Sequence, residues 1–335
     1  MNLKLHKKVK MIKKLILVPI SLFFECIVGF RNYLYTKKIL NITKSNIPII
    51  SVGNIEVGGT GKTPFVISIC KLLLDRQLNP LVITRGYNRK NKKSVYINKN
   101  SYQKFSANEI GDEPVHILAK LNGIDMIVDH NKSRAVLYAN QLKNVDFIVL
   151  DDGFQSRYIN KTIDIVLLNM KRPKKMYQLL PAGILREPIK SLKRSHLQYI
   201  IKGKDKLNLG AKKLNSNYTI YKYMNSKKEK ISVLEDNCRL LSCCGIGDPL
   251  SFHETLKNLN INIAETLVFQ NHVHYTKKRL ILINEKLINC DGLITTYKDF
   301  VKFDKNFINN NLIYVVDINI VIDDKKLIDL IKTHE

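Results

Sequence analysis

The sequence has no CxxC pair and no regular spacing among its six cysteines, which are Cys26, Cys70, Cys238, Cys243, Cys244 and Cys290. Zinc clusters and disulfide frameworks depend on such spacing, so we expect neither, and a reducing compartment fits the chain best. The adjacent pair Cys243 and Cys244 is expected to pack inside a strand and not to react.

Acidic residues are scarce relative to basic ones: 29 Asp and Glu stand against 55 Lys and Arg, for a formal net charge of +26. Such an excess can release counterions from a nucleic-acid backbone. The lysines are scattered, however, and no motif of a nucleic-acid-binding fold accompanies them, so we expect no nucleic-acid partner. An anionic membrane surface is the better electrostatic partner, because each lysine near such a surface gains about 1 kcal/mol.

No apolar run reaches the roughly 20 residues that a transmembrane helix needs. The run at residues 15–30 is interrupted by Pro19 and Glu25, and it follows a lysine-rich stretch at residues 4–14. No small-residue cleavage site follows, which argues against a signal peptide. A core helix and a helix lying in the membrane interface remain as alternatives. The basic flank favours a membrane-associating helix for residues 1–45.

The rest of the chain shows an alternation typical of α/β proteins. With 335 residues and 45% hydrophobic composition, the chain is long enough for two packed units. From residue 46 onward, short apolar runs alternate with segments of helical period, which indicates a parallel sheet covered by helices on both faces. We expect a P-loop domain at 46–203, a polar, lysine-rich linker at 204–235 and a smaller α/β domain at 236–335.

A glycine-rich turn, SVGNIEVGGTGKTP, lies between an expected strand and an expected helix at residues 51–64. This is the context of a phosphate-binding loop, in which backbone N–H groups and a helix N-terminus face phosphate oxygens. The strict GxxxxGK[ST] pattern is not met, because Glu56 stands where its first glycine belongs. A plain strand-to-helix turn is the alternative, but it needs only one capping residue.

This loop predicts ATP and Mg²⁺ as cofactors. Lys62 is expected to reach the β and γ phosphates, and the Thr63 hydroxyl to bind Mg²⁺. The predicted nucleotide-binding residues are Glu56, Val57, Gly58, Gly59, Thr60, Gly61, Lys62 and Thr63.

A second anchor for Mg²⁺ is predicted at residues 146–155, DFIVLDDGFQ. Four apolar residues carry Asp151 and Asp152 to the carboxyl end of a strand, where ligands bind in open α/β sheets. Either aspartate alone could instead cap the following turn, and which of them binds the metal stays open. Gln155 is a further candidate at the metal.

Several strings occur together in one order: VGGTGKTP, TRGYNRK (84–90), GDEP (111–114), DDGFQ (151–155), LPAGILREP (180–188), GIGDP (245–249), FQNHVHYT (269–276) and TTYKDFVKF (295–303). In these strings the chain resembles the tetraacyldisaccharide 4'-kinases of lipid A synthesis. The resemblance runs from about residue 46 to residue 303, and its specificity comes from the number and order of the strings.

The resemblance implies transfer of the ATP γ-phosphate to the 4'-hydroxyl of a tetraacyl disaccharide 1-phosphate, giving lipid IVA. It implies action at the cytoplasmic face of the bacterial inner membrane, with the acylated disaccharide and the membrane surface as partners and no obligate protein partner. An acylated sugar stays in the bilayer, which would explain an N-terminal membrane helix.

The resemblance also implies residue roles. Asp112 matches the catalytic base and His272 its partner, while Arg186 would offset charge on the transferred phosphoryl group and Glu187 would belong to the metal site. Taken without the resemblance, Asp112 could simply be a first-turn acid of a helix. Asn271 stands where the family commonly has an aspartate, a departure that bears on the rate more than on the reaction class.

One alternative from another class is a membrane-associated deviant P-loop ATPase of the partitioning type, which combines a similar loop with an amphipathic helix. Such proteins usually carry a lysine before the glycine pair, where this chain has Val57. A basic nucleic-acid-binding protein that uses the nucleotide as a switch is the second alternative, and its binding would fall steeply with added salt.

Overall fold

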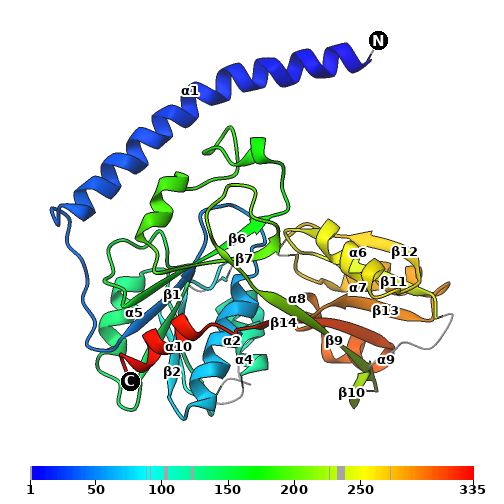
Figure 1. Ribbon diagram of the computed structural model, residues 1–335. Coiled ribbons are helices and arrows are strands. Elements are labelled where there is room, and N and C mark those ends of the chain that lie inside the picture. The colour runs from blue at the N-terminus through cyan, green and yellow to red at the C-terminus, as the bar shows by residue number, and fades with distance from the viewer. Residues whose placement is uncertain are drawn as a thin grey trace.

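The structure is a computed structural model that describes residues 2–87, 89–90, 92–101, 105–121, 124–225, 227–231, 238–271 and 273–335. Two α/β units lie side by side, and a long N-terminal helix runs along the first of them (Figure 1). This arrangement agrees with the α/β fold class expected from the sequence.

The first unit contains an eight-stranded sheet with the order β3-β4-β2-β5-β1-β6-β7-β8. Its pairs are parallel except for the antiparallel pair β3 and β4. The central strands are apolar on both faces, as in sheets that helices cover on both sides. The strands are β1 (Ile49–Gly53), β2 (Pro80–Thr84), β3 (Val95–Ile97), β4 (Asp125–Val128), β5 (Phe147–Asp151), β6 (Ile163–Met170), β7 (Leu197–Gly203) and β8 (Lys212–Lys213).

Helices cover both faces of this sheet. On one face, buried residues of α2 (Lys62–Asp75), α4 (Asp112–Lys120) and α10 (Lys325–Lys332) share a core with alternate strand residues such as Val82. On the other face, α5 (Lys132–Ala139) packs against the intervening strand residues. A short helix, α3 (Ala107–Ile110), precedes α4.

The second unit contains a six-stranded sheet with the order β10-β9-β14-β13-β11-β12. Cys243 and Cys244 are buried in β11, as predicted. The strands are β9 (Asn215–Met224), β10 (Lys227–Ile231), β11 (Leu240–Cys244), β12 (Ile263–Val268), β13 (Gly292–Thr296) and β14 (Ile313–Val321). The helices are α6 (Pro249–Asn258), α7 (Lys277–Leu287), α8 (Tyr297–Phe300) and α9 (Lys305–Asn310).

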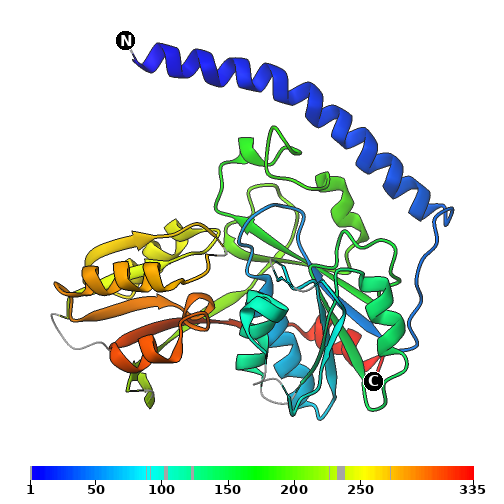
Figure 2. The ribbon, with the colours of Figure 1, turned by 180° about the vertical axis from the view of Figure 1, so that it is seen from behind.

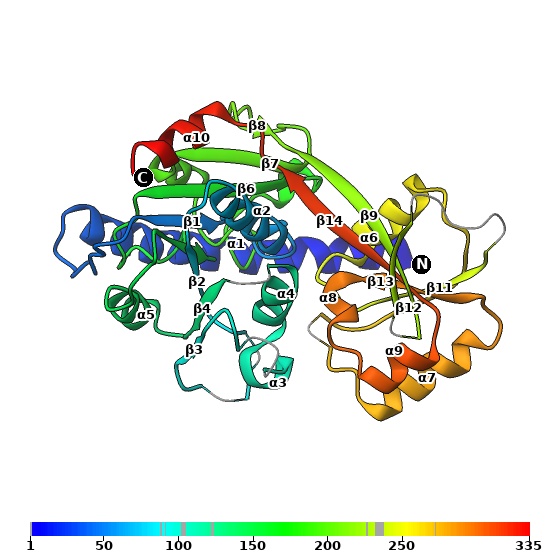
Figure 3. The same cartoon turned by 90° about the horizontal axis from the view of Figure 1, so that it is seen from below.

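Two long antiparallel strands, β9 and β14, connect the units (Figure 3). Within the stretch expected to be a linker, residues 215–224 form β9 and 227–231 form β10, and β8 pairs with β7 of the first sheet. The prediction missed these strands because most of their side chains are exposed or half-exposed, so the apolar alternation is weak. The chain then returns to the first unit, where α10 buries Leu327 and Ile331.

The N-terminal helix α1 (Asn2–Thr36) continues through Pro19. Its segment Leu17–Thr36 is long and apolar enough to cross a membrane by length and composition. This segment extends beyond residue 30, where the apolar run in the sequence ends. In the views from the front and from behind, α1 follows the first unit and its N-terminal end projects away from it (Figures 1 and 2).

Candidate active site

The glycine-rich loop between β1 and α2 has the backbone of a phosphate-binding loop. Gly58 and Gly61 adopt positive φ angles of 112° and 78°, in the left-handed region that favours glycine. Gly61 is the N-cap of α2, so Lys62 and the half-buried Thr63 begin the helix. The first-turn N–H groups of α2 and its dipole therefore face the loop, where they favour an anion.

Side-chain amides brace this loop from inside. The Asn54 amide donates to the Glu56 carbonyl at 2.8 Å and to the hydroxyl of the buried Thr60 at 2.9 Å. Gln155, predicted at the metal, donates from Nε2 to the Asn54 carbonyl at 2.7 Å. Gln155 therefore supports the loop backbone, and its amide nitrogen is engaged there.

Glu56 and Val57 join the loop to the LPAGILREP segment. The Val57 N–H donates to the Ile184 carbonyl at 2.8 Å, and the Arg186 N–H donates to Ile55 at 2.7 Å. The Glu56 side chain is buried and accepts from the Asn169 N–H at 2.7 Å. Burial raises the pKa of Glu56 to about 7. The Glu56 carboxyl thus supports the loop from behind, so any contribution to nucleotide binding would come from its backbone.

Asp152 lies between two cations that the sequence assigned to the nucleotide. Lys62 Nζ is 3.3 Å from Asp152 Oδ1, and Arg186 Nη1 is 3.3 Å from Asp152 Oδ2. Burial alone would raise the pKa of Asp152, but Lys62, Lys132 and Arg186 together lower it to about 2. Asp152 is therefore ionised at neutral pH, beside the helix that begins the phosphate loop.

Asp151 is buried next to it, at the end of β5, and accepts a hydrogen bond of 3.0 Å from Thr84. Burial and the neighbouring Asp152 raise the pKa of Asp151. Behind the pair, the buried Lys132 donates to the carbonyls of Asp151 and Asp152, both at 2.6 Å. This lysine holds the turn in which Asp152 adopts a φ of +49°.

The two aspartates are compatible with Mg²⁺. The buried Oδ1 atom of Asp151 has no hydrogen-bond donor, as expected of an oxygen that could bind a cation, and Asp152 Oδ1 faces the Lys62 ammonium at 3.3 Å. Among the described residues, no three His, Cys, Asp or Glu side chains gather closely enough to hold a metal by themselves. Magnesium suits such a sparse site, because it is usually bound by one or two carboxylates, substrate phosphates and water.

Glu187, also assigned to the metal, is engaged elsewhere. Its fully buried carboxylate accepts from Arg194 at 2.8 Å and from Asn32 of α1 at 3.0 Å, and Arg31 lies 3.5 Å away. Burial opposes ionisation, but these partners, Arg194 foremost, lower the pKa of Glu187. Its assignment as a metal ligand is therefore not supported, because both oxygens bind α1 and Arg194.

Asp112 is the first residue of α4 and is buried at the contact between the two units. Lys302 of the second unit places its Nζ 3.7 Å from Asp112 Oδ2. One residue later, Glu113 pairs with Lys298 at 3.2 Å. His272 lies outside the described residues, but the next residue, Val273, accepts a 3.2 Å hydrogen bond from Lys302 through its carbonyl.

The second unit also reaches the phosphate loop. The Cα of Gly247, in the GIGDP string, lies so close that a Cβ built there would be 3.8 Å from the Gly59 nitrogen and 3.3 Å from the Asn271 side chain. Asp248 caps α6 and lies 3.6 Å from Lys202 of the first unit. The GIGDP string therefore meets the P-loop side of the first unit, and Asn271 lies beside that string.

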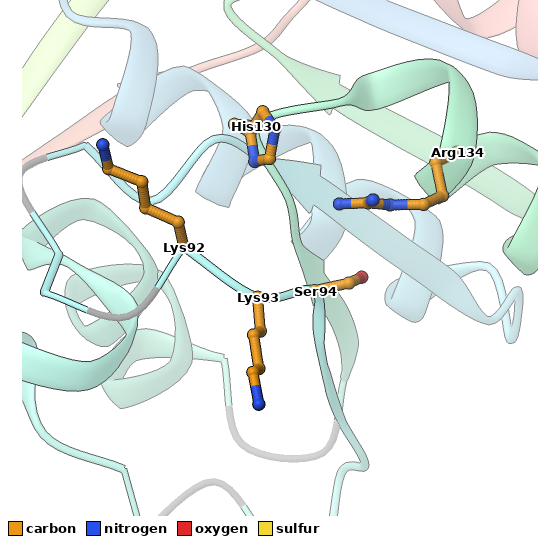
Figure 4. A pocket seen from close by; sticks show the side chains of 5 residues that line it. All are labelled: Lys92, Lys93, Ser94, His130 and Arg134. Carbon is orange, nitrogen blue, oxygen red and sulfur yellow. The ribbon is translucent and has the colours of Figure 1, made fainter.

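A cavity of about 510 Å³ lies apart from this cluster, at the β3 and β4 side of the sheet. Its wall is basic and is formed by Lys92, Lys93, Ser94, His130 and Arg134 (Figure 4). Asp129, directly after β4, orients Arg134 through two hydrogen bonds of 2.8 Å. The cavity carries no residue that the sequence assigned to the site.

Three contributors were missed by sequence reasoning: Asn54, Lys132 and Lys302. Asn54 and Lys132 each follow a strand's carboxyl end, which is a signal that could have marked them. Lys302 gave no such signal, because its contact with Asp112 depends on how the two units pack.

The sheet order, the phosphate loop and the acids beside it define a P-loop phosphotransferase. The profile of the tetraacyldisaccharide-1-P 4'-kinase family matches residues 13–335. The chain belongs to this family and is an ATP-dependent kinase.

Named relatives agree with this membership. The tetraacyldisaccharide 4'-kinase of Aquifex aeolicus is 34% identical over 265 residues, covering 78% of this chain and 82% of that protein. The enzyme of the same name from Psychromonas ingrahamii is 32% identical over 289 residues, covering 86% of this chain and 85% of that protein. A crystal structure of apo-form LpxK from Aquifex aeolicus in complex with ATP superposes with a TM-score of 0.77 and 29% identity, covering 95% of this chain and 98% of that one.

Proposed function

We propose that this kinase transfers the γ-phosphate of MgATP to the 4'-hydroxyl of a tetraacyl disaccharide 1-phosphate, giving lipid IVA. The observation that carries the proposal is the cluster at the phosphate loop, in which Asp152 lies 3.3 Å from both Lys62 and Arg186. The relatives' names supply the acceptor, and the cluster supplies the groups that phosphoryl transfer requires.

The phosphate-binding roles follow from these positions. The N–H groups of the loop at residues 58–63 hold the phosphates, whereas the Val57 N–H is bonded to Ile184, and Lys62 and Arg186 balance the charge on the transferred group. Mg²⁺ would be held by Thr63 together with Asp151 or Asp152, and when bound it supplies positive charge that screens the phosphate oxygens. Gln155 does not contact the nucleotide in this proposal and instead supports the loop through its hydrogen bond to Asn54.

Asp112 is the proposed general base, which accepts the proton of the acceptor hydroxyl. It is buried at the α4 N-terminus, and its sequence neighbour Glu113 contributes to the raised pKa of Asp151, after burial and Asp152. This supports a position of the α4 N-terminus near the proposed metal site. His272 is the proposed partner of Asp112, a role that rests on the resemblance.

Membrane contact is proposed through α1 lying in the interface. One face of its C-terminal half binds the first unit: Ser21 donates to Leu179 at 3.1 Å, Glu25 pairs with Lys190 at 3.3 Å, and Thr36 accepts from Arg157 at 3.1 Å. The opposite face exposes the apolar side chains of Ile20, Leu22, Phe23, Ile27, Phe30 and Tyr33. A helix whose C-terminal half is held by its own domain suits the interface better than a span, because spanning would break these contacts. The cytoplasmic face is proposed because ATP is available there.

The proposal is tested by incubating full-length protein with MgATP and tetraacyl disaccharide 1-phosphate in mixed micelles and following the mass gain of one phosphate. Lys62→Ala and Asp112→Ala are each expected to reduce the product by at least about 100-fold. Wild-type turnover in either variant would remove the role given to that residue. ATP hydrolysis that does not depend on the lipid would instead favour the partitioning type of ATPase.

A further inference from the structure

Lys302 is a buried cation at the contact between the units, and nothing in the kinase chemistry above uses it. Its side chain is 3% exposed, and Asp112, which it faces, is equally buried. It lies in the segment after α8, so it belongs to the second unit, whereas Asp112 belongs to the first. Burying an unpaired ammonium costs free energy, so Lys302 needs groups around it that compensate its charge.

Among the described residues, three oxygen-bearing groups and the Tyr275 ring, whose centre is 5.3 Å away, lie around the Lys302 ammonium. Asp299 Oδ1 is 2.9 Å away, the Val273 carbonyl accepts a hydrogen bond at 3.2 Å, and Asp112 Oδ2 is 3.7 Å away. Asp299 is itself fixed, because its Oδ2 accepts from the Gly245 N–H at 2.9 Å and from the Thr296 hydroxyl at 2.8 Å.

Lys302 therefore joins segments that are distant in sequence. Through Asp299 it is tied to Gly245, which opens the string that approaches the phosphate loop. Through Val273 it is tied to the string 269–276. Its third partner is the residue proposed as the base.

We propose that Lys302 is a positioning residue for Asp112. This inference rests on the proposed function, because Lys302 can position the general base only if Asp112 is that base. The ammonium keeps the Asp112 carboxylate ionised and aligned, and it places the 269–276 string beside that carboxylate when the two units are packed together. An opposite charge at this distance favours the charged form of a carboxyl group.

Other charged groups on the elements around Asp112 have partners of their own. On α4 itself, Glu113 is paired with Lys298 of α8. On α3, Glu109 accepts hydrogen bonds from Ser106. On α2, Lys71 is an electrostatic neighbour of Lys120, which lies at the opposite end of α4 from Asp112. Among the described residues, Lys302 is the cation that forms an ion pair with Asp112 within 4 Å.

The experiment compares the full-length variants Lys302→Met, Lys302→Arg and Lys298→Met in the kinase assay over pH 5 to 9. Lys298→Met is the matched control, because it removes a lysine from the same contact that pairs with Glu113 instead. Lys302→Met is expected to lower kcat by at least about tenfold, move the acidic limb of the rate profile upward by about one pH unit, and leave KM for ATP unchanged. Lys302→Arg should recover most of the loss.

Removing Lys302 alone leaves Asp299 as a buried unpaired charge, which could unfold the protein. The double variant Asp299→Asn/Lys302→Met removes both charges and keeps an acceptor for the Gly245 N–H. It should melt near the wild-type temperature and retain the shifted profile. A wild-type profile in this folded variant, or a loss no larger than that of Lys298→Met, overturns the proposal.

A double-mutant cycle separates this inference from the proposed function. In an Asp112→Asn background, Lys302→Met should reduce the residual rate less than twofold, because the group it positions is gone. An undiminished tenfold effect there would show that Lys302 acts elsewhere. If Asp112→Asn itself turns over like the wild type, the assigned base is wrong, whereas an inactive Asp112→Asn beside wild-type Lys302 variants rejects this inference alone.

Discussion

Asn32 in the N-terminal helix donates a 3.0 Å hydrogen bond to Glu187, a buried carboxylate next in sequence to Arg186. The Arg186 guanidinium in turn lies 3.3 Å from Asp152 at the phosphate loop. Two adjacent residues therefore connect the proposed membrane helix to the proposed metal site: Glu187 binds the helix, and Arg186 lies beside Asp152.

Replacing Glu187 tests whether it braces the fold or binds the metal. Glu187→Ala would leave the partly exposed guanidinium of Arg194 and the Asn32 amide without their acceptor, which costs about 1–3 kcal/mol. We expect a matching drop in the free energy of unfolding by urea titration. The Mg²⁺ concentration for half-maximal activity should stay unchanged.

Glu25→Gln is the control for this substitution, because Glu25 pairs with Lys190 on the same side of α1 but is exposed. Such surface pairs contribute about 0–1 kcal/mol. A Glu187→Ala protein with wild-type stability and a tenfold weaker response to Mg²⁺ would restore the metal assignment.

Asp152→Asn tests the proposed metal site. Because the variant keeps the shape but loses the charge that faces Lys62 and Arg186, the Mg²⁺ concentration for half-maximal activity should rise by at least about tenfold. Asp164→Asn is the control, since Asp164 pairs with Lys161. An equal Mg²⁺ response in the wild type and in Asp152→Asn would rule out the ligand role of Asp152.

The fold was largely predictable because its information is local. The strands β1, β2, β5 and β6 are continuous apolar runs, and a strand buried on both faces has that signature wherever it sits. β9 is different: it pairs with β14 over its whole length, yet most of its side chains are not buried. Its position depends on a partner some 90 residues away, which local composition does not reveal.

The site was predictable where a motif specifies backbone geometry. Gly58 and Gly61 occupy positions that require positive φ, so the glycine pattern in the sequence directly predicts the backbone conformation of the loop. The roles of side chains were harder to predict, because the sequence alone does not distinguish a carboxylate that binds a metal from one that supports the fold. Asp152 and Glu187 were both assigned to the metal, but Glu187 proved to be enclosed by Arg194 and α1, a contact that only the packed chain creates.

Glu56 predicts a pH-dependent stability. Burial raises its pKa from 4.5 to about 7, so the folded state favours the protonated form. Below pH 4.5 both states are protonated and Glu56 has no effect. As the pH rises towards 7 the unfolded state releases the proton more readily, so folding loses stability, and above 7 the full cost of about 3 kcal/mol is present.

Glu56→Gln should remove this dependence, because glutamine cannot ionise and still accepts from the Asn169 N–H. We expect the variant to be more stable than the wild type at pH 8 and little different at pH 4.5, measured by urea unfolding. Glu254→Gln, at a surface carboxylate, should show no such trend. A constant difference between the two pH values would contradict the assignment of the burial cost to Glu56.

The exposed face of α1 should determine membrane binding. Phe23 and Phe30 are 68% and 65% exposed on the side turned away from the first unit. Burying each in the acyl boundary contributes about 1.5–3 kcal/mol, so Phe23→Ser/Phe30→Ser should weaken binding to anionic vesicles by about 100-fold or more in a flotation assay. Ile288→Ser, at a residue that is 81% exposed on the second unit, should bind like the wild type.

Salt separates the two forces in the same assay. Raising NaCl from 0.1 to 0.5 M should weaken binding of the wild type without abolishing it, because screening acts on the lysines and not on the apolar face. Phe23→Ser/Phe30→Ser should be released by the same salt to a larger extent than the wild type, since with both phenylalanines gone its binding depends more on the attraction between lysines and anionic lipid. If it binds like the wild type at both salt concentrations, the exposed face of α1 is not the membrane contact.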